Sequence, residues 1–387
     1  KIMKKTFISL LLLVPLLIFA SSVNSNSIFE LTNQNDNSVN FNFELPQIEE
    51  LNDTINGTVY SKLYHPLAAT TLENGKPELL FFTTLIAIPS QGSVKIEANF
   101  KNDKTFNLKN KIFPSQGSDI KDGNDKVNIY CDEKFYASPY AFINQKAVVS
   151  KPFIMRDLRL VSVNVYPFTY KDGQLVAAQN VDITVSFTDV PSNNQLNSTA
   201  ALSKHYENIY KTSVLNYSRS TRGIYQQPTL LLIHAASDVS SISLPLNTFI
   251  DWKQQKGFNV IVAGPNEYGS VSSTNVKTYI QNLWDTSENR PEFIILFGDP
   301  ANGARQVLTF FHTFGYYTGE GDSPYTYLEG NDEVPDVTVG RISGETTVEL
   351  TTIVNKARRY EKTPNIAGDY FEHQLLVGDE SPSGIST

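Results

Sequence analysis

The chain has 387 residues, and division by the ~150 residues of a typical domain predicts two domains with additional segments. Its composition, 40% hydrophobic, 19% charged and 11% aromatic, excludes wholesale disorder because it can form a core. The net charge of -8, without a long basic run, argues against a nucleic-acid partner. A single cysteine excludes an intramolecular disulfide and a cysteine-based metal cage.

The first residues have the three-part layout of a secretory signal. Lys1, Lys4 and Lys5 precede an apolar stretch at residues 7–20, and small residues follow it. The stretch is shorter than the ~20 residues that a membrane span requires. We therefore predict a signal peptide at residues 1–22 and no membrane span after its removal. A secreted or bacterial cell-surface location follows, since export without disulfides favours the bacterial envelope.

Residues 27–190 show alternation of hydrophobic and polar residues, which is typical of half-buried antiparallel strands. The alternation is clearest at residues 39–45, 94–98, 127–131, 161–165 and 181–187. Asp172-Gly173 predicts a hairpin turn after the run at 161–165, and several short strands joined by turns predict a β-sandwich. Cys131 alternates with Ile129, so we expect a packed small hydrophobic residue rather than a nucleophile.

Residues 191–227 are predicted to form a linker that contains a short helix within residues 200–217. From residue 228 to 387, short apolar runs alternate with amphipathic helical segments, which predicts a parallel sheet with right-handed crossovers. Strands are expected at residues 230–233, 258–262, 293–297, 337–342 and 375–377. The three helices are expected at 245–256, after a cap at Ser272 or Ser273, and after a capping box of Thr346 with Glu349.

Oxygen-bearing residues gather near the expected ends of these strands, where ligands of parallel sheets bind. Asp299 follows the third strand, and Asp332 and Asp336 belong to an acidic turn at residues 329–336. Calcium takes six to eight oxygen ligands, and these carboxylates can supply the charged ones. The alternative is that Gly-Asn-Asp and Pro-Asp only build turns. The residue pattern is compatible with both interpretations.

Other candidate residues give less support for a catalytic or ligand-binding site. His234 closes the first strand of the expected parallel sheet, yet no cysteine or Gly-x-Ser-x-Gly motif follows it in this half. A nucleophile and base therefore cannot be paired there. Arg341 follows a strand, and we expect it to pair with a nearby acid.

Several motifs occur in a fixed order along the second half: Phe249-Ile250-Asp251-Trp252-Lys253, Lys256-Gly257, residues 293–299, Asp322, Tyr325, Gly330-Asn331-Asp332, Val339-Gly340-Arg341-Ile342, Lys356 and Tyr360-Glu361. Their order and spacing resemble the gingipain-type family of secreted cysteine peptidases. The first half resembles the propeptide of that family, most clearly at residues 155–160, 166–167 and 206–217. Arg219 and Arg222 then lie in the segment that is cut on activation.

The resemblance implies a β-sandwich propeptide and a caspase-like α/β sheet, with a catalytic His-Gly after one strand and a catalytic cysteine after the next. The printed chain ends at Thr387 before either motif would be reached. No catalytic residue is carried over, and we expect a peptidase domain that is truncated on its C-terminal side and inactive as given.

The resemblance also implies a structural calcium site. Asp299, Asp332 and Asp336 match carboxylate ligands of the family, while Glu329 and Val334 match positions that give main-chain oxygens. The resemblance therefore favours calcium over the turn interpretation.

These observations predict the zymogen of a secreted cysteine endopeptidase of the gingipain type. The expected partners are protein or peptide substrates and the chain's own propeptide as inhibitor. Two alternatives stay open. One is a sortase-like transpeptidase of a bacterial outer-membrane secretion system. The other is a non-enzymatic surface binding protein with a degenerate peptidase-like domain.

Overall fold

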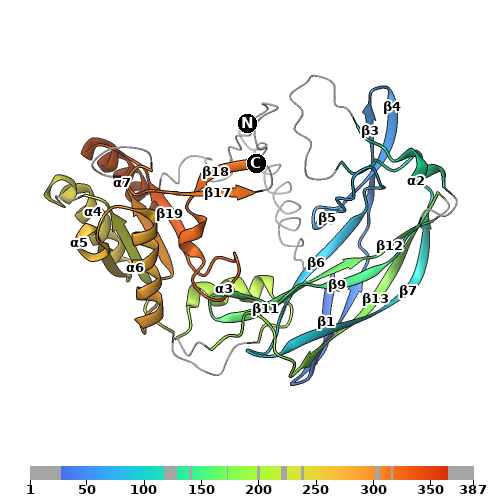
Figure 1. Cartoon of the computed structure of the whole chain (residues 1–387), viewed down its shortest axis with the longest axis horizontal. Helices are drawn as coiled ribbons and strands as arrows, with labels where there is room; N and C mark the ends of the chain where they lie inside the picture. The colour runs from blue at the N-terminus through green and yellow to red at the C-terminus, as the bar shows by residue number, and fades with distance from the viewer. Residues whose placement is uncertain are drawn as a thin grey trace, which may run out of the picture.

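The structure is a computed structural model that describes residues 28–116, 129–138, 142–171, 173–197, 201–218, 225–236, 239–300, 306–314 and 317–364. The chain forms an antiparallel part and a parallel α/β part, which lie side by side with helix α3 (Lys204–Ser213) between them (Figure 1). The predicted signal at residues 1–22, Arg219, Arg222 and the predicted strand at 375–377 lie outside the described residues.

The antiparallel part contains two main sheets. The first consists of six strands: β1 (Phe29–Asn35), β2 (Ser38–Glu44), β7 (Ser93–Phe106), β8 (Phe142–Ile143), β12 (Phe168–Lys171) and β13 (Gln174–Thr188). The second consists of five strands: β5 (Ala68–Thr70), β6 (Leu80–Ala87), β9 (Lys146–Val149), β10 (Phe153–Met155) and β11 (Leu158–Tyr166). A separate hairpin, β3 (Glu49–Ile55) with β4 (Thr58–Tyr64), and helix α2 (Glu133–Ala137) complete this part.

Alternating side chains of the two sheets form one core. In the first sheet, Phe41 and Phe43 of β2 pair with Ile183 and Val181 of β13, and all four are buried. Residues of β6 and β11 in the second sheet, among them Val163, belong to the same hydrophobic cluster. The alternation of hydrophobic and polar residues therefore identifies the face of each strand that packs in the core, and the predicted β-sandwich is confirmed.

Two local predictions in the sandwich are wrong in detail. The run at residues 161–165 lies in β11 of the second sheet, whereas the hairpin partner of β13 is β12, which begins after Pro167. Proline has no N–H to donate to a strand ladder, and the chain changes sheets there. Cys131 is not in a strand, because Asp132 follows it and caps α2 by accepting a hydrogen bond from the Phe135 N–H.

The parallel part contains a four-stranded sheet with the order β15-β14-β16-β19, and every neighbouring pair is parallel. Its strands are β14 (Thr229–His234), β15 (Asn259–Ala263), β16 (Phe293–Phe297) and β19 (Thr338–Ile342). The helices are η2 (Val239–Ile242), α4 (Ser243–Gln255), α5 (Pro265–Tyr268), α6 (Ser273–Thr286), η3 (Ser323–Thr326) and α7 (Thr347–Lys362). The strands and helices predicted within the described part of this half are thereby confirmed.

Helices cover both faces of the parallel sheet. Leu230 and Leu232 of β14 pack in one cluster with residues of α4 and α7, while Leu231 and Ile233 pack in another with α6. Successive strand residues point to opposite faces, so a continuous apolar run is the signature of a strand that is buried on both sides. The capping box of Thr346 with Glu349 begins α7 as predicted.

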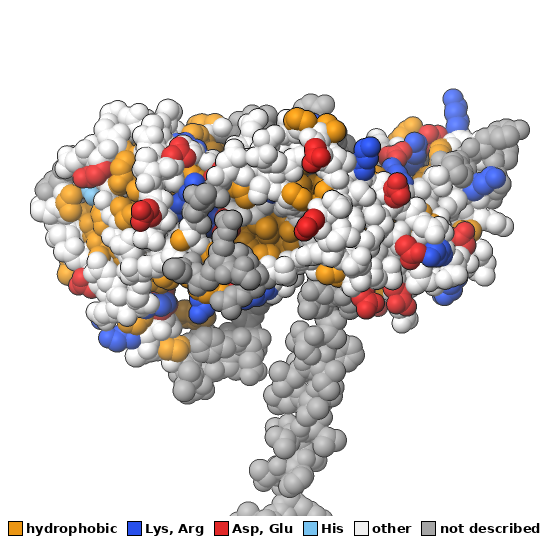
Figure 2. All heavy atoms as spheres, turned by 90° about the horizontal axis from the view of Figure 1, so that it is seen from below, with side chains coloured by type: hydrophobic (Ala, Val, Ile, Leu, Met, Phe, Trp, Pro, Cys, Tyr) orange, Lys and Arg blue, Asp and Glu red, His pale blue; other side chains and the backbone are white. Residues whose placement is uncertain are grey.

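A hairpin of β17 (Phe310–Phe314) and β18 (Tyr317–Gly321), which no sequence pattern predicted, lies between β16 and β19 in the chain. Acidic and basic side chains intermingle on the antiparallel part in the view of Figure 2. Within the described residues, no helix is both long enough and apolar enough to cross a membrane.

Candidate functional site at the junction of the two parts

The tip of one sandwich hairpin reaches into the parallel part. Strands β10 and β11 are antiparallel with Met155 opposite Leu158, so Arg156 and Asp157 form the two-residue turn between them. Arg156 has a backbone φ of 56°, in the left-handed region that side chains other than Gly, Asn and Asp rarely adopt. The side chain of Arg156 is nevertheless only 2% exposed. A strained and buried arginine therefore marks the junction.

The guanidinium of Arg156 donates four hydrogen bonds, and each acceptor belongs to a residue beyond 225. Nη1 bonds the carbonyl oxygens of Pro291, at 2.7 Å, and Asp336, at 3.2 Å. Nη2 bonds the Arg290 carbonyl oxygen at 3.1 Å and Gln226 Oε1 at 3.2 Å. Most of the five guanidinium N–H donors are satisfied in this way, which is what burial of an arginine requires.

Two aromatic rings flank the same guanidinium. The Arg156 Cζ atom lies 5.0 Å from the ring centroid of Trp284 in α6 and 5.1 Å from that of Tyr206 in α3. A second guanidinium, that of Arg290, lies 4.5 Å from the Trp284 centroid and pairs with Glu329 at 2.9 Å. Cation–π contacts of this kind stabilise most where water is excluded, and Trp284 is fully buried.

Asp336 contacts the main chain of Arg156 directly. Its carboxylate accepts N–H bonds from Arg156, Leu328 and Glu329, each at 2.7 Å, and its side chain is fully buried. Burial raises the pKa of Asp336 to about 7, whereas the three N–H donors act in the opposite direction. The carboxylate thus joins the hairpin tip to the acidic turn.

A second contact lies beside the first. Asp332 Oδ2 accepts hydrogen bonds from the Ile154 N–H at 2.9 Å and from Asn194 Nδ2 at 3.0 Å. Asn194, which has a φ of 52°, also accepts a bond from the Asn331 N–H at 2.7 Å. Arg159 fixes the Asn194 segment, because its guanidinium donates to the carbonyl oxygens of residues 193 and 194. The antiparallel part therefore meets the turn at two linked points.

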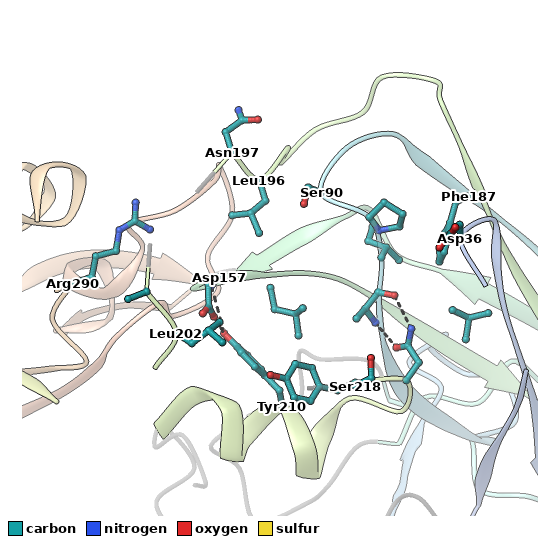
Figure 3. A pocket seen from close by; sticks show the side chains of 18 of the residues that line it. Asp36, Ser90, Asp157, Phe187, Leu196, Asn197, Leu202, Tyr210, Ser218 and Arg290 are labelled. Carbon is teal, nitrogen blue, oxygen red and sulfur yellow. Dashed lines mark hydrogen bonds between the residues drawn. The ribbon is translucent and has the colours of Figure 1, made fainter. Parts of the chain in front are cut away.

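An open pocket of about 1410 Å³ lies next to the junction, with walls from both parts (Figure 3). Asp157 and Tyr210, which are hydrogen-bonded to each other, lie between Arg290 on one side and Asp36 and Phe187 on the other. Burial raises the pKa of Asp157, and the bond from Tyr210 opposes that shift. The two parts thus contact each other at Arg156 and Asn194, and also through the rings of His205 and Phe293, whose centroids lie 4.7 Å apart, while the pocket next to Arg156 stays open.

The structure does not gather the five predicted calcium ligands into one site. Asp299 follows β16 at the carboxyl edge of the parallel sheet, where Ser343 Oγ donates to it at 2.7 Å. Asp336 precedes β19 at the opposite, amino edge, because β16 and β19 are parallel and in register. Five residues of extended strand alone separate these edges by about 13 Å. The prediction overlooked that the end of one parallel strand and the start of its neighbour lie at opposite edges.

The remaining predicted ligands make hydrogen bonds within the protein. Both Asp332 and Asp336 accept N–H donors on both oxygens, and Glu329 accepts from Trp284 Nε1 and Arg290. The Val334 N–H donates to Asp332 at 3.0 Å. N–H groups thus occupy the carboxylate oxygens of Asp332 and Asp336. The oxygens expected from Glu329 and Val334 are main-chain oxygens, which these bonds do not involve, so calcium binding at the turn stays a prediction. Within the described ranges, no three His, Cys, Asp or Glu side chains are arranged to hold a metal.

Three other residues considered in the sequence, Arg341, His234 and Cys131, make contacts that support the structure of the protein. Arg341 pairs with Asp322 at 2.6 Å, as predicted, and also donates to the carbonyl oxygen of Gly298. His234 is buried, and its ring lies directly against Gly264, where an added Cβ would meet His234 Cε1 at 2.3 Å. Lys111 Nζ lies 3.1 Å from Cys131 Sγ, and burial raises the pKa of the thiol. A raised pKa disfavours the nucleophilic thiolate.

Sequence reasoning missed the residues that build the junction, namely Arg156, Asn194, Gln226, Trp284 and Arg290. In the sequence, Arg156 belongs only to a stretch that resembles a propeptide, and it is not a candidate contact residue there. The available signal was an arginine in a short turn between two apolar runs, where Gly or Asn is the usual choice. Gln226 and Arg290 stand just before two of the expected parallel strands. This placement indicates that both residues lie at the amino edge of the parallel sheet, where they can accept bonds from the arginine.

Comparisons with known proteins agree with this division of the chain. Residues 24–231 match the family model described as Propeptide_C25, and residues 224–386 match the model described as Peptidase family C25. Gingipain R1 of Porphyromonas gingivalis is 24% identical over 311 residues, which are 79% of this chain and 30% of that protein. Lys-gingipain of the same species is 26% identical over 364 residues, which are 89% of this chain and 20% of that protein.

One solved structure that resembles this one is the complex of Porphyromonas gingivalis RgpB pro- and mature domains. It has a TM-score of 0.42 at 22% identity and covers 50% of this chain and 100% of that one. The chain spans less than a third of the length of gingipain R1 and of Lys-gingipain. The propeptide model alone matches more than half of the chain, and the peptidase model follows it. The chain therefore belongs to peptidase family C25, the gingipain family, and carries the propeptide of that family.

Proposed function

We propose that this chain is the pro-domain and the amino-terminal part of the peptidase domain of a secreted cysteine endopeptidase zymogen. The pro-domain is the antiparallel part with α3, and the peptidase part begins near residue 228. Its substrates are proteins or peptides, and its own pro-domain is the inhibitor.

The observation that carries this proposal is the junction itself. The pro-domain inserts Arg156 into the peptidase part, where four acceptors and a buried Trp284 receive it. A module that merely preceded the peptidase part in the chain would not require a buried charge in the neighbouring domain, since burial of an unpaired guanidinium is costly. The insertion therefore supports a pro-domain that docks on its peptidase.

The full-length protein tests the chemistry. After activation it should hydrolyse peptide bonds, and a thiol alkylating agent should abolish that activity. The control is full-length Cys131→Ser, since Cys131 is the single cysteine of these residues and lies in the pro-domain. This variant should keep both the activity and its sensitivity to the alkylating agent. Loss of activity in Cys131→Ser, or resistance of the wild type to alkylation, would contradict the proposal.

The same assay separates the alternatives. A sortase-like transpeptidase would transfer the acyl group of a cleaved peptide to an added amine, which mass spectrometry detects as a ligated product. A non-enzymatic surface protein would give neither hydrolysis nor ligation. Because the signal-like residues 1–22 point to export, we also propose that the protein is secreted or displayed on a bacterial cell surface. Cell fractionation checks this location.

A further inference from the structure

The acceptors of the Arg156 guanidinium share one place in the fold. Gln226 precedes β14, Arg290 and Pro291 precede β16, and Asp336 precedes β19. All of them therefore lie at the amino edge of the parallel sheet. Active sites of open parallel sheets form at the carboxyl edge. The pocket for Arg156 thus lies on the side of the peptidase part away from the edge where catalysis is expected.

The pocket is held in shape by bonds that do not involve Arg156. The N–H groups of Leu328 and Glu329 orient the Asp336 carboxylate. Gln226 Nε2 donates to the Arg290 carbonyl oxygen at 2.7 Å, which turns Gln226 Oε1 toward the guanidinium. Trp284 Nε1 donates to Glu329 at 3.0 Å. These bonds do not involve Arg156, so they orient the acceptors independently of its side chain. The Gln226 N–H also bonds the Leu202 carbonyl oxygen at 2.9 Å, which joins the pocket to the pro-domain side.

The shape of the pocket selects a guanidinium over an ammonium. Two of its acceptors bind Nη1 of Arg156 and two bind Nη2. The planar guanidinium carries both nitrogens, so it can bond to both pairs of acceptors at once. The Trp284 ring provides a face for a flat, delocalised cation. A lysine ammonium is a point charge with three donors, and from one position it would leave part of the acceptor set unpaired.

We propose that Gln226, Trp284, Arg290, Pro291 and Asp336 form a guanidinium receptor that retains the pro-domain after the chain is cut between residues 218 and 225. This inference rests on the proposed zymogen function and adds a mechanism for latency after cleavage. The receptor acts from the amino edge of the sheet, so retention does not depend on occupation of the catalytic edge. Arg156 is the residue it recognises, and Asn194 on Asp332 provides a second, weaker contact.

The test uses full-length protein with a site for a sequence-specific protease placed within residues 219–224. After complete cleavage, the protein is diluted, and the fraction of pro-domain that co-elutes with the peptidase is followed over time. Arg156→Lys should increase the dissociation rate at least tenfold. Gln226→Leu, which alters the receptor side, should increase it in the same direction. The control is Val163→Ala, which weakens the sandwich core away from the junction and should change the rate less than twofold.

Equal dissociation rates for wild type, Arg156→Lys and Gln226→Leu would overturn the inference. So would a Val163→Ala effect as large as that of Arg156→Lys, because retention would then follow pro-domain stability rather than recognition. Thermal melts of the uncut variants show whether each is folded, and Gln226→Leu keeps the test decisive if Arg156→Lys does not fold. Retention is scored by mass rather than activity, so failure of the proposed peptidase function would leave this result interpretable.

Discussion

At the level of single residues, backbone strain coincides with contact between the parts. Arg156 and Asn194 both have positive φ angles, and both contact the turn that contains Asp332 and Asp336. Asparagine enters the left-handed region readily, whereas for arginine the cost is about 1 kcal/mol. Such strain persists only where the surroundings fix it, and the bonds to Asp336 do so. The position of Arg156 is thus explained by docking rather than by the local preference of the hairpin.

From the hydrogen bonds of Asp332 and Asp336 we predict how calcium affects the melting temperature. The oxygens of Asp332 and Asp336 already accept N–H bonds, so we expect wild-type intact chain to melt at the same temperature with calcium and with a chelator. Asp332→Asn should lower the melting temperature equally in both buffers, since it replaces hydrogen bonds to a carboxylate by weaker bonds to a neutral amide, at a cost of about 1 kcal/mol. A melting temperature that rises with calcium in the wild type and not in Asp332→Asn would restore the metal interpretation.

At the level of elements, an ion-pair cluster joins the two helices on one face of the parallel sheet. Glu361 of α7 accepts bonds from Lys253, at 2.8 Å, and Lys256, at 2.7 Å, both at the end of α4, and from Trp252 Nε1 at 2.9 Å. Desolvation raises the pKa of Glu361, but these donors outweigh it and lower the pKa to about 2. The cluster fixes the distance between α4 and α7.

Glu361 therefore gives a pH-dependent contribution to stability. Its folded-state pKa is depressed, so the contribution is present above the usual pKa of 4.5 and disappears as the pH falls toward about 2. We expect Glu361→Gln to lower stability at pH 7 by about 1 kcal/mol, a modest value because the pair is partly exposed. Urea unfolding at pH 7 and pH 3 checks this. The prediction is wrong if the difference between wild type and variant stays constant over that range.

At the level of the whole molecule, the two parts are joined by a segment that includes residues 219–224, which lie outside the described residues. The chain leaves the pro-domain after α3, and the peptidase sheet begins at Thr229. Around the join, the Gln226 N–H bonds the Leu202 carbonyl oxygen at 2.9 Å, and Tyr225 Oη bonds Glu207 at 2.5 Å. Residues on either side of the segment are thus paired by hydrogen bonds in addition to the covalent link between them.

Limited proteolysis with a trypsin-like enzyme should first cut the intact chain between Ser218 and Tyr225. Arg219 and Arg222 supply the cleavage sites in this polar segment, which separates two independent cores. Mass spectrometry of the first fragments identifies the cut, and a chain with both arginines changed to glutamine should resist it. First stable fragments that split before residue 189 would show that the domain boundary has been placed incorrectly.

The sequence by itself determined the elements and their class. The alternation at Val39, Phe41 and Phe43 predicted sandwich strands because a sheet face repeats every second residue. The uninterrupted run of β14 predicted a strand covered on both sides, and Thr346 with Glu349 predicted where α7 begins. These signals are local, since each depends on neighbours within one strand or one helical turn. Signals of this kind can therefore be interpreted without knowledge of the fold.

Only the tertiary structure decided which charged groups meet. Asp299 and Asp336 looked like one cluster along the chain, but parallel pairing of β16 and β19 places them at opposite edges of the sheet. Arg156 and Asp336 are 180 residues apart in sequence and share a hydrogen bond. A buried charge is tolerated only where the fold brings acceptors to it, and that condition depends on the packing of one domain on another. The residues of the docking site could therefore be recognised only after both domains were in place.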